Sequence, residues 1–150
     1  RNRYQKRDTI LSAHKMNIVI DTSTLISAIG WKEGKPRKIL NLGLSNNFTI
    51  LISGETMKEL KGVLSRNKFD FIEKELKEEF LILLKEISKM VKIKTSIKLC
   101  KDPKDNMFIE LAIDGKADYI ISSDADLLGL DNAKGIKIVT PSEFLEMITE

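Results

Sequence analysis

Short apolar runs rich in isoleucine recur along the chain and are separated by longer segments of mixed polarity. Runs of three or four such residues, bounded by polar or turn residues, are typical of buried strands. We predict strands at residues 18–20, 49–52, 91–93, 119–122 and 136–139. Because helical segments separate most of these runs, the order of elements predicts βαβ units around a mostly parallel sheet.

The intervening segments carry apolar residues three or four positions apart, which is the spacing of one helix face. Capping residues and prolines at first helical positions mark several of the helix starts. We predict helices at 22–29, at 37–46, from Asp102 to Gly115, and from Thr140 to Ile148. Another helix is predicted after Ser53, with Met57, Leu60 and Leu64 on one face. The longest is predicted after the capping residues Asp70 and Glu73, and its apolar stripe is Ile72, Leu76, Phe80, Leu83, Ile87 and Val91. The expected fold is a three-layer α/β/α sandwich.

The composition is that of an ordinary globular protein, with 42% apolar and 31% charged residues in a chain of 150. This length suits one domain, and no apolar stretch could span a bilayer, so no membrane partner is expected. Cys100 is the only cysteine, which excludes an internal disulfide and favours a reducing compartment. Residues 1–15 lack the apolar segment of a secretory signal, so we expect a cytoplasmic location.

The net charge of +3 is unevenly distributed, because five basic residues and one acid precede residue 16. We interpret residues 1–15 as a basic leader outside the core and residues 16–150 as a single domain. Such a charge run could contact nucleic-acid phosphates, but it is more often solvated, and we favour that interpretation.

Acidic residues follow the predicted strands and open the helix that precedes one of them. Asp21 comes directly after strand 18–20, Asp124 and Asp126 follow strand 119–122, and Asp105 lies at a helix start. In an open α/β sheet the ligand crevice lies outside the carboxyl ends of the strands, so these side chains can converge. Converging carboxylates repel each other unless a cation joins them, and Mg²⁺ or Mn²⁺ suits oxygen ligands.

Each acid also has a purely structural interpretation. Asp21 and Asp124 could be helix N-caps, and Asp105 lies in a first turn, where acids favour the helix dipole. Glu59, one position from an apolar helix face, could reach inward or remain solvated. Capping explains one of the two acids after residue 123 but not both. Because four segments each place an acid at the same predicted edge, we favour a shared site.

The order and spacing of these segments resemble the PIN domain family of metal-dependent nucleases, over nearly all of residues 16–149. The resemblance is closest to the branch that contains the toxins of toxin–antitoxin pairs. The last two of the four motifs are the most specific. The motifs are Ile18-Val19-Ile20-Asp21-Thr22-Ser23, Ser53 to Leu60, Lys101-Asp102-Pro103-Lys104-Asp105-Asn106 with Glu110-Leu111-Ala112, and Ala117 to Leu128.

Matching positions imply four catalytic acids, a metal site that shares three of them, and small polar residues in support. Asp105 matches the third acid better than Asp102, because its helix places apolar residues toward the sheet at the expected spacing. The implied catalytic acids are Asp21, Glu59, Asp105 and Asp124; the implied metal ligands are Asp21, Asp105, Asp124 and Asp126; the supporting residues are Thr22, Ser23 and Ser122.

The resemblance implies an endoribonuclease that hydrolyses RNA phosphodiester bonds with Mg²⁺ or Mn²⁺, with single-stranded RNA as substrate. It also implies an antitoxin protein as a partner if the chain is a toxin, and a homodimer. The alternative is a non-catalytic PIN-like module that binds RNA or a protein. His14, the only histidine, lies in the leader, so histidine-based catalysis is not expected in the core.

Substrate contacts are less defined by the sequence. Trp31 could stack on a base or pack into a dimer interface. Cys100 is interpreted as a small buried residue without a histidine to activate it. Candidate phosphate contacts are Lys32, Lys35, Arg37, Lys38, Lys101 and Lys104.

Overall fold

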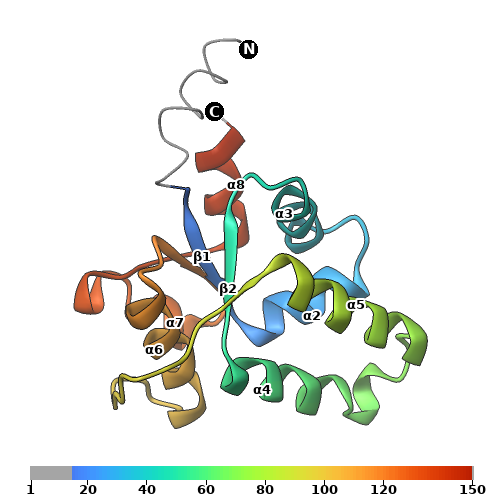
Figure 1. Ribbon diagram of the computed structural model, residues 1–150, viewed down its shortest axis with the longest axis horizontal. Helices are drawn as coiled ribbons and strands as arrows, with labels where there is room; N and C mark the ends of the chain where they lie inside the picture. Colours follow the sequence, from blue (N-terminus) through green and yellow to red (C-terminus); the bar gives the residue numbers. More distant parts are fainter. Residues whose placement is uncertain (1–14, 150) are drawn as a thin grey trace.

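The computed structural model describes residues 15–149, which contain a five-stranded sheet between two layers of helices (Figure 1). All strand pairs are parallel, and the strand order is β3-β2-β1-β4-β5. The strands are β1 Asn17–Ile20, β2 Thr49–Ile52, β3 Lys89–Met90, β4 Tyr119–Ile121 and β5 Lys137–Val139. The predicted three-layer α/β/α sandwich with a parallel sheet is confirmed.

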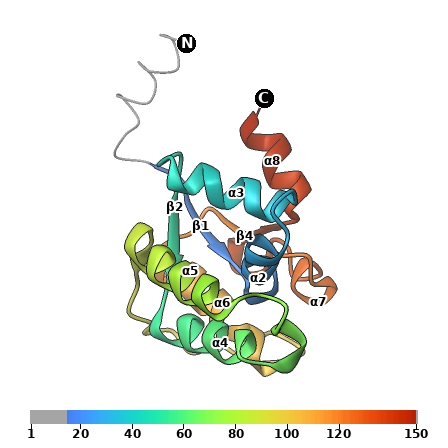
Figure 2. The same ribbon diagram turned by 90° about the vertical axis from the view of Figure 1, so that its right-hand side faces the viewer.

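Helices α2 to α5 lie on one side of the sheet and α6 and α7 on the other, as the two views show (Figures 1 and 2). The last helix, α8, packs against α3. The α-helices are α2 Thr22–Gly30, α3 Lys35–Leu44, α4 Gly54–Leu64, α5 Lys74–Ile87, α6 Asn106–Gly115, α7 Ala125–Leu128 and α8 Pro141–Thr149. Short 3-10 turns lie at Asn67–Phe69, Pro103–Asp105 and Ala133–Gly135.

Alternate residues of the central strands enter the two halves of the core. In β1, Ile18 and Ile20 pack with α2 to α5, whereas Val19 packs with Phe108 and Ile109 of α6. Strand side chains alternate between faces, so a strand covered on both faces must be apolar throughout. This explains why the strands read as continuous isoleucine-rich runs.

The strand order places the candidate acids. The connections leave β1 toward β2 on one side and reach β4 on the other, so the order reverses between β1 and β4. A crevice forms outside the carboxyl ends of strands at such a reversal. Asp21 follows β1 and Asp124 follows β4, so both lie at this crevice.

The predicted bounds of the longest helix were wrong at both ends. The helix α5 spans only Lys74–Ile87, and Glu73, not Asp70, is its N-cap residue. Ser88 is extended because the next residues pair with β2, Lys89 with Leu51 and Met90 with Ile52. The third strand is therefore two residues earlier than the predicted 91–93, and Val91 is outside the helix.

Other boundaries differ by a turn or less. The helix α3 begins at Lys35, after Gly34, and ends before Asn46, whose φ of 67° is left-handed. The segment after Asp102 begins as a 3-10 turn, and regular α-helix starts only at Asn106. The predicted caps at Ser53 and Thr140 are confirmed: each hydroxyl accepts a hydrogen bond from an N–H three residues on, at 3.1 Å in both cases.

Residues 91–100 cross the edge of the sheet as an extended segment without regular structure. Three side chains of α6, each one helical turn from the next, accept hydrogen bonds from backbone N–H groups of this segment. Asn106 accepts from Leu99 and Cys100, Glu110 from Ile97, and Asp114 from Lys94 and Thr95. These hydrogen bonds fix the segment against α6, and the segment leads directly to Asp102.

None of the helices formed by residues 15–149 has the length and apolar composition needed to cross a bilayer.

Candidate active site

Asp21 is a buried carboxylate at the carboxyl end of the central strand. Its side chain is 4% exposed, and Oδ1 accepts a hydrogen bond from the Thr24 backbone N–H at 3.0 Å, which caps α2. The Ser23 hydroxyl donates to the same oxygen at 3.4 Å. Asp21 therefore caps α2 through Oδ1 and also lines the cleft described below.

Ser122 joins the ends of the two central strands. Its hydroxyl donates a hydrogen bond to Oδ2 of Asp21 and accepts one from the Asp124 backbone N–H at 2.9 Å. Ser122 is fully buried. One hydroxyl thus sets the position of Asp21 relative to the turn that carries Asp124.

Asp124 is the N-cap of α7, and its Oδ2 accepts a hydrogen bond from the Leu127 N–H at 3.0 Å. Its side chain also lines the same cleft as Asp21. Asp126, two residues on, is exposed and is not among the residues that line the cleft. The structure therefore brings Asp124 into the cleft and leaves Asp126 at its margin.

Asp102 and Asp105 both line the cleft, from the 3-10 turn before α6. Asp102 caps that turn by accepting a hydrogen bond from the Lys104 N–H at 3.0 Å. Asp105 is the residue before α6, and its side chain makes no capping hydrogen bond. Asp105 therefore has the freer carboxylate of the two, although Asp102, the alternative that the sequence offered for the third acid, lines the same cleft.

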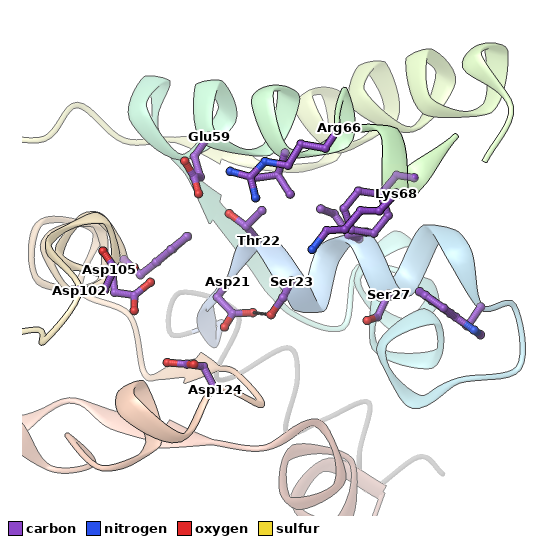
Figure 3. Close-up of a pocket in the computed structure, with 15 residues that line it drawn as sticks. Asp21, Thr22, Ser23, Ser27, Glu59, Arg66, Lys68, Asp102, Asp105 and Asp124 are labelled. Carbon is purple, nitrogen blue, oxygen red and sulfur yellow. Dashed lines mark hydrogen bonds between the residues drawn. The ribbon is translucent and has the colours of Figure 1, made fainter. Parts of the chain in front are cut away.

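Glu59 reaches the cleft from the opposite wall, formed by α4 (Figure 3). It is partly exposed. Thr22, in the first turn of α2, is buried and lines the cleft, and its hydroxyl has no hydrogen-bond partner within residues 15–149. Of the two neighbouring hydroxyls, Ser23 and not Thr22 is bonded to Asp21.

These residues line one cleft with a volume of about 390 Å³. Figure 3 shows Asp21, Asp102, Asp105 and Asp124 gathered toward one end and Lys68 toward the other. The lining residues are Asp21, Thr22, Ser23, Ile26, Ser27, Trp31, Glu59, Val63, Arg66, Lys68, Phe69, Asp102, Asp105, Phe108 and Asp124. Four sequence segments that are distant along the chain therefore contribute acids to one depression.

Negative charge accumulates in the cleft. Burial, and to a lesser extent the negative charges of Asp124, Asp102, Asp21 and Asp126, together raise the pKa of Asp105 to about 6. Burial also raises the pKa of Asp21, with a smaller contribution from Asp124, while hydrogen bonds from Ser122 and Thr24 act in the opposite direction. The ionised site is thus destabilised unless a cation offsets it.

A divalent cation fits this site by donor type and charge. The acids supply hard oxygen ligands, and the unpartnered Thr22 hydroxyl can bond to a water in the cleft. Within residues 15–149, however, no three acidic, histidine or cysteine side chains are grouped closely enough to hold an ion as they stand. To bind a cation, the acidic side chains would have to rotate or to contact the ion through water molecules. Mg²⁺ commonly retains several waters when it is bound to a protein.

Cys100 is not a nucleophile in this setting. Burial, together with the negative charges of Asp105 and Asp102, raises the pKa of its thiol to about 11. The thiol therefore remains protonated near neutral pH, and the thiolate is the reactive form. Cys100 is half-buried, whereas the sequence had led us to expect a buried residue.

The basic residues in and around the loop after α2 do not reach the cleft. Arg37 donates hydrogen bonds to the Ala28 and Ile29 carbonyl oxygens, and Lys35 donates to Ser142 at 2.7 Å. Lys32 and Lys38 are exposed. The cations that do line the cleft, Arg66 and Lys68, were not anticipated, because the 3-10 turn after α4 that carries them was not foreseen.

The fold and the cleft together define an α/β/α domain with an acid-lined crevice where the strand order of a parallel sheet reverses. The family model described as PIN domain matches residues 17–126. The chain belongs to the PIN domain family.

Two relatives illustrate the similarity. The chain is 32% identical over 142 residues to the uncharacterized protein MJ1680 of Methanocaldococcus jannaschii, and the match covers 88% of this chain and 91% of that protein. A crystal structure of VapBC2 from Rickettsia felis bound to a DNA fragment from their promoter superposes with a TM-score of 0.59 at 17% identity, over 83% of this chain and 98% of that one. At this identity the second match establishes the fold alone.

Proposed function

We propose that the chain is a metal-dependent endoribonuclease that hydrolyses RNA at the acid-lined cleft, with residues 16–150 acting as one nuclease domain. One observation carries the proposal: acids from four separate segments line a single depression, and the carboxylates of Asp124, Asp102 and Asp21 contribute to the raised pKa of Asp105. Such a concentration of charge is unfavourable for stability. Binding of Mg²⁺ or Mn²⁺ would offset this repulsion. A metal-dependent site also agrees with membership of the PIN domain family.

The proposed ligands are Asp21, Asp105 and Asp124, with Asp126 reaching the site through water from the margin. Bound Mg²⁺ or Mn²⁺ would neutralise the phosphodiester and lower the pKa of the attacking water. Ser122 and Ser23 hold the carboxylate of Asp21 in place, and Thr22 offers its hydroxyl to solvent in the cleft. Glu59, which lines the opposite wall of the cleft, is the residue we propose to accept a proton from the attacking water.

The first test is cleavage of labelled single-stranded RNA with Mn²⁺ or Mg²⁺, with parallel reactions in EDTA. Asp124→Asn should lose cleavage yet fold, since the amide oxygen can still accept the Leu127 N–H. Asp70→Asn is the matched control, because Asp70 is exposed and outside the cleft. Metal-dependent cleavage lost only in Asp124→Asn supports the proposal. If no RNA is cut and no metal binds by calorimetry, the protein is a non-catalytic binding module.

We further propose that the protein is the toxin of a toxin–antitoxin pair, acting in the cytoplasm as a homodimer. Support comes from the shared fold with VapBC2 of Rickettsia felis. Expression of the wild-type chain alone should then arrest growth, and the Asp124→Asn chain should not. Normal growth at equal expression of an active nuclease would favour a housekeeping role.

A further inference from the structure

Beyond the four aspartates the cleft is basic and aromatic, with Trp31, Arg66, Lys68 and Phe69 among its lining residues. Figure 3 shows Lys68 and Ser27 toward the end away from the aspartates, and Arg66 between Lys68 and Glu59. Arg66 and Lys68 come from the turn after α4, and Trp31 is the residue that follows α2. The two halves of one cleft therefore differ in charge, which suits a ligand whose parts differ in chemistry.

The two cations are available for an external anion. Arg66 and Lys68 are both exposed, and the only ion pair formed among residues 15–149 joins Lys137 to Asp131. Lys68 Nζ lies 5.2 Å from the centre of the Phe69 ring, which positions the ammonium group without neutralising it. Lys35 and Arg37, by contrast, are engaged with groups of the fold itself.

The aromatic side chains beside them are exposed. Trp31 is 54% and Phe71 60% exposed, and their rings meet edge to face with centres 5.6 Å apart. The Phe71 contact restricts the Trp31 ring while leaving over half of its surface free. A ring held in this way loses little conformational entropy when a planar ligand stacks on it.

We propose that this basic and aromatic end, defined by Trp31, Arg66, Lys68 and Phe69, binds one unpaired nucleotide of the RNA strand next to the bond cut at the acids. Arg66 and Lys68 contact the backbone phosphate, and the base stacks on Trp31. This inference rests on the proposed function and assigns the nucleotide-binding part of the same cleft. Cations with neighbouring aromatic rings are the usual means of holding single strands, because every base has a flat face.

The arrangement selects against duplex RNA. A paired base is already stacked between its neighbours, so it can reach Trp31 only after leaving the helix, which costs free energy. The acids alone have no such preference, because a phosphodiester is present in both forms. Preference for an unpaired nucleotide is thus a property of the Trp31 end of the cleft.

The test is binding in EDTA, where no cleavage occurs, which separates it from the test of nuclease activity. Trp31 is the only tryptophan of the chain, so its fluorescence reports on this position alone. We expect an unlabelled short oligoribonucleotide to quench the emission saturably, and its duplex to do so far less. RNA binding measured by anisotropy without any change in Trp31 emission would overturn the proposal, as would equal quenching by the duplex.

Variants assign the individual contacts. Arg66→Gln and Lys68→Gln should each weaken binding and lower the dependence of log affinity on log salt by about 0.7 per lost phosphate contact. Trp31→Ala should weaken binding about 5- to 100-fold, and Trp31→Phe should largely restore it. Lys85→Gln and Ile82→Ala, which remove an exposed charge and an exposed apolar side chain on α5, are the controls.

The two proposals can fail separately. If metal-dependent cleavage occurs but Trp31→Ala and Arg66→Gln cut RNA with unchanged KM and unchanged preference for single strands, the nucleotide site is wrong and the nuclease stands. If Trp31 emission is quenched by RNA in EDTA but no RNA is ever cut, the nucleotide site stands and the catalytic proposal fails.

Discussion

Asp105 illustrates how one residue can be unfavourable for the fold and still be present. Its pKa is raised to about 6 from the ordinary value of 3.8, chiefly by burial and then by neighbouring carboxylates. Between these two values the folded protein binds more protons than the unfolded chain, so the free energy of unfolding falls as the pH rises through this interval. The full penalty is present above pH 6, at neutral pH.

Asp105→Asn should therefore stabilise the metal-free protein at neutral pH. The substitution removes a charge and breaks no capping hydrogen bond, because the Asp105 side chain makes none. Thermal unfolding in EDTA should show a higher midpoint for the variant at pH 7 and nearly equal midpoints at pH 4. A variant that is less stable at pH 7 would contradict the assigned crowding of charge.

The hydroxyl of Ser122 makes hydrogen bonds to both Asp21 and Asp124 and so sets the positions of two acids. Ser122→Ala removes the donor to Asp21 and leaves the Asp124 N–H without its acceptor. Loss of partners for buried polar groups costs about 1–3 kcal/mol in the free energy of unfolding. If the nuclease proposal holds, cleavage should fall about 10- to 100-fold, as for other residues that orient metal ligands.

Ser122→Thr, which keeps the hydroxyl, and denaturant unfolding of all three proteins separate the two effects. Restored cleavage in Ser122→Thr alongside lost cleavage in Ser122→Ala would assign the effect to the hydroxyl. Unchanged cleavage in Ser122→Ala would show that Asp21 holds its position without it.

At the scale of elements, α6 and the extended segment 91–100 act as one unit. Asn106 is 9% exposed, and its side-chain oxygen accepts hydrogen bonds from the Leu99 N–H at 3.1 Å and the Cys100 N–H at 2.8 Å. The residue adjoins Asp105 but does not line the cleft. It therefore fixes the backbone that leads into the acidic segment.

Asn106→Ala should loosen that backbone and lower stability by about 1–3 kcal/mol, because two N–H groups lose their acceptor. Hydrogen exchange should accelerate most at Leu99 and Cys100, with little change in β1. Asn106→Asp retains an acceptor oxygen and should preserve the protection of these two amides. Uniform acceleration across the sheet would instead indicate global destabilisation.

The sequence predicted those elements whose signals are local and missed those that depend on pairing. Strand β2 and the caps at Ser53 and Thr140 were predictable because apolar runs and capping side chains act over a few residues. The end of α5 was not, because Lys89 and Met90 leave helical geometry to pair with β2, a contact between distant segments. Helical periodicity continued to Val91 without revealing that contact.

The same distinction holds for the cleft. Asp21 and Asp124 could be placed beside each other because the carboxyl ends of adjacent parallel strands share one edge. Arg66 and Lys68 could not, since their position depends on how the turn after α4 folds back over α2. The order of acids along the chain therefore revealed one end of the cleft and not the other.

At the scale of the molecule, the sheet and its two helical layers hold repelling carboxylates together through burial of apolar residues elsewhere. Two core clusters, one on each face of the sheet, contain the fully buried Ile18, Ile120, Leu84 and Leu111. The penalty at the cleft is tolerated because these clusters stabilise the fold independently of the acids. A ligand that relieves the penalty should then stabilise the molecule as a whole.

Mn²⁺ should raise the unfolding midpoint of the wild-type protein at pH 7, since an ion that binds only the folded state adds about 2.7 kcal/mol at a concentration of 100 Kd. The rise should be smaller at pH 4.5, because Asp105, with a pKa of about 6, is then largely protonated and the ion must displace its proton. Asp105→Asn and Asp124→Asn should lose most of the Mn²⁺ effect, and Asp70→Asn should keep it. Calorimetric scans with Mn²⁺ and then excess EDTA would measure this. An equal rise in all four proteins would place the ion outside the cleft.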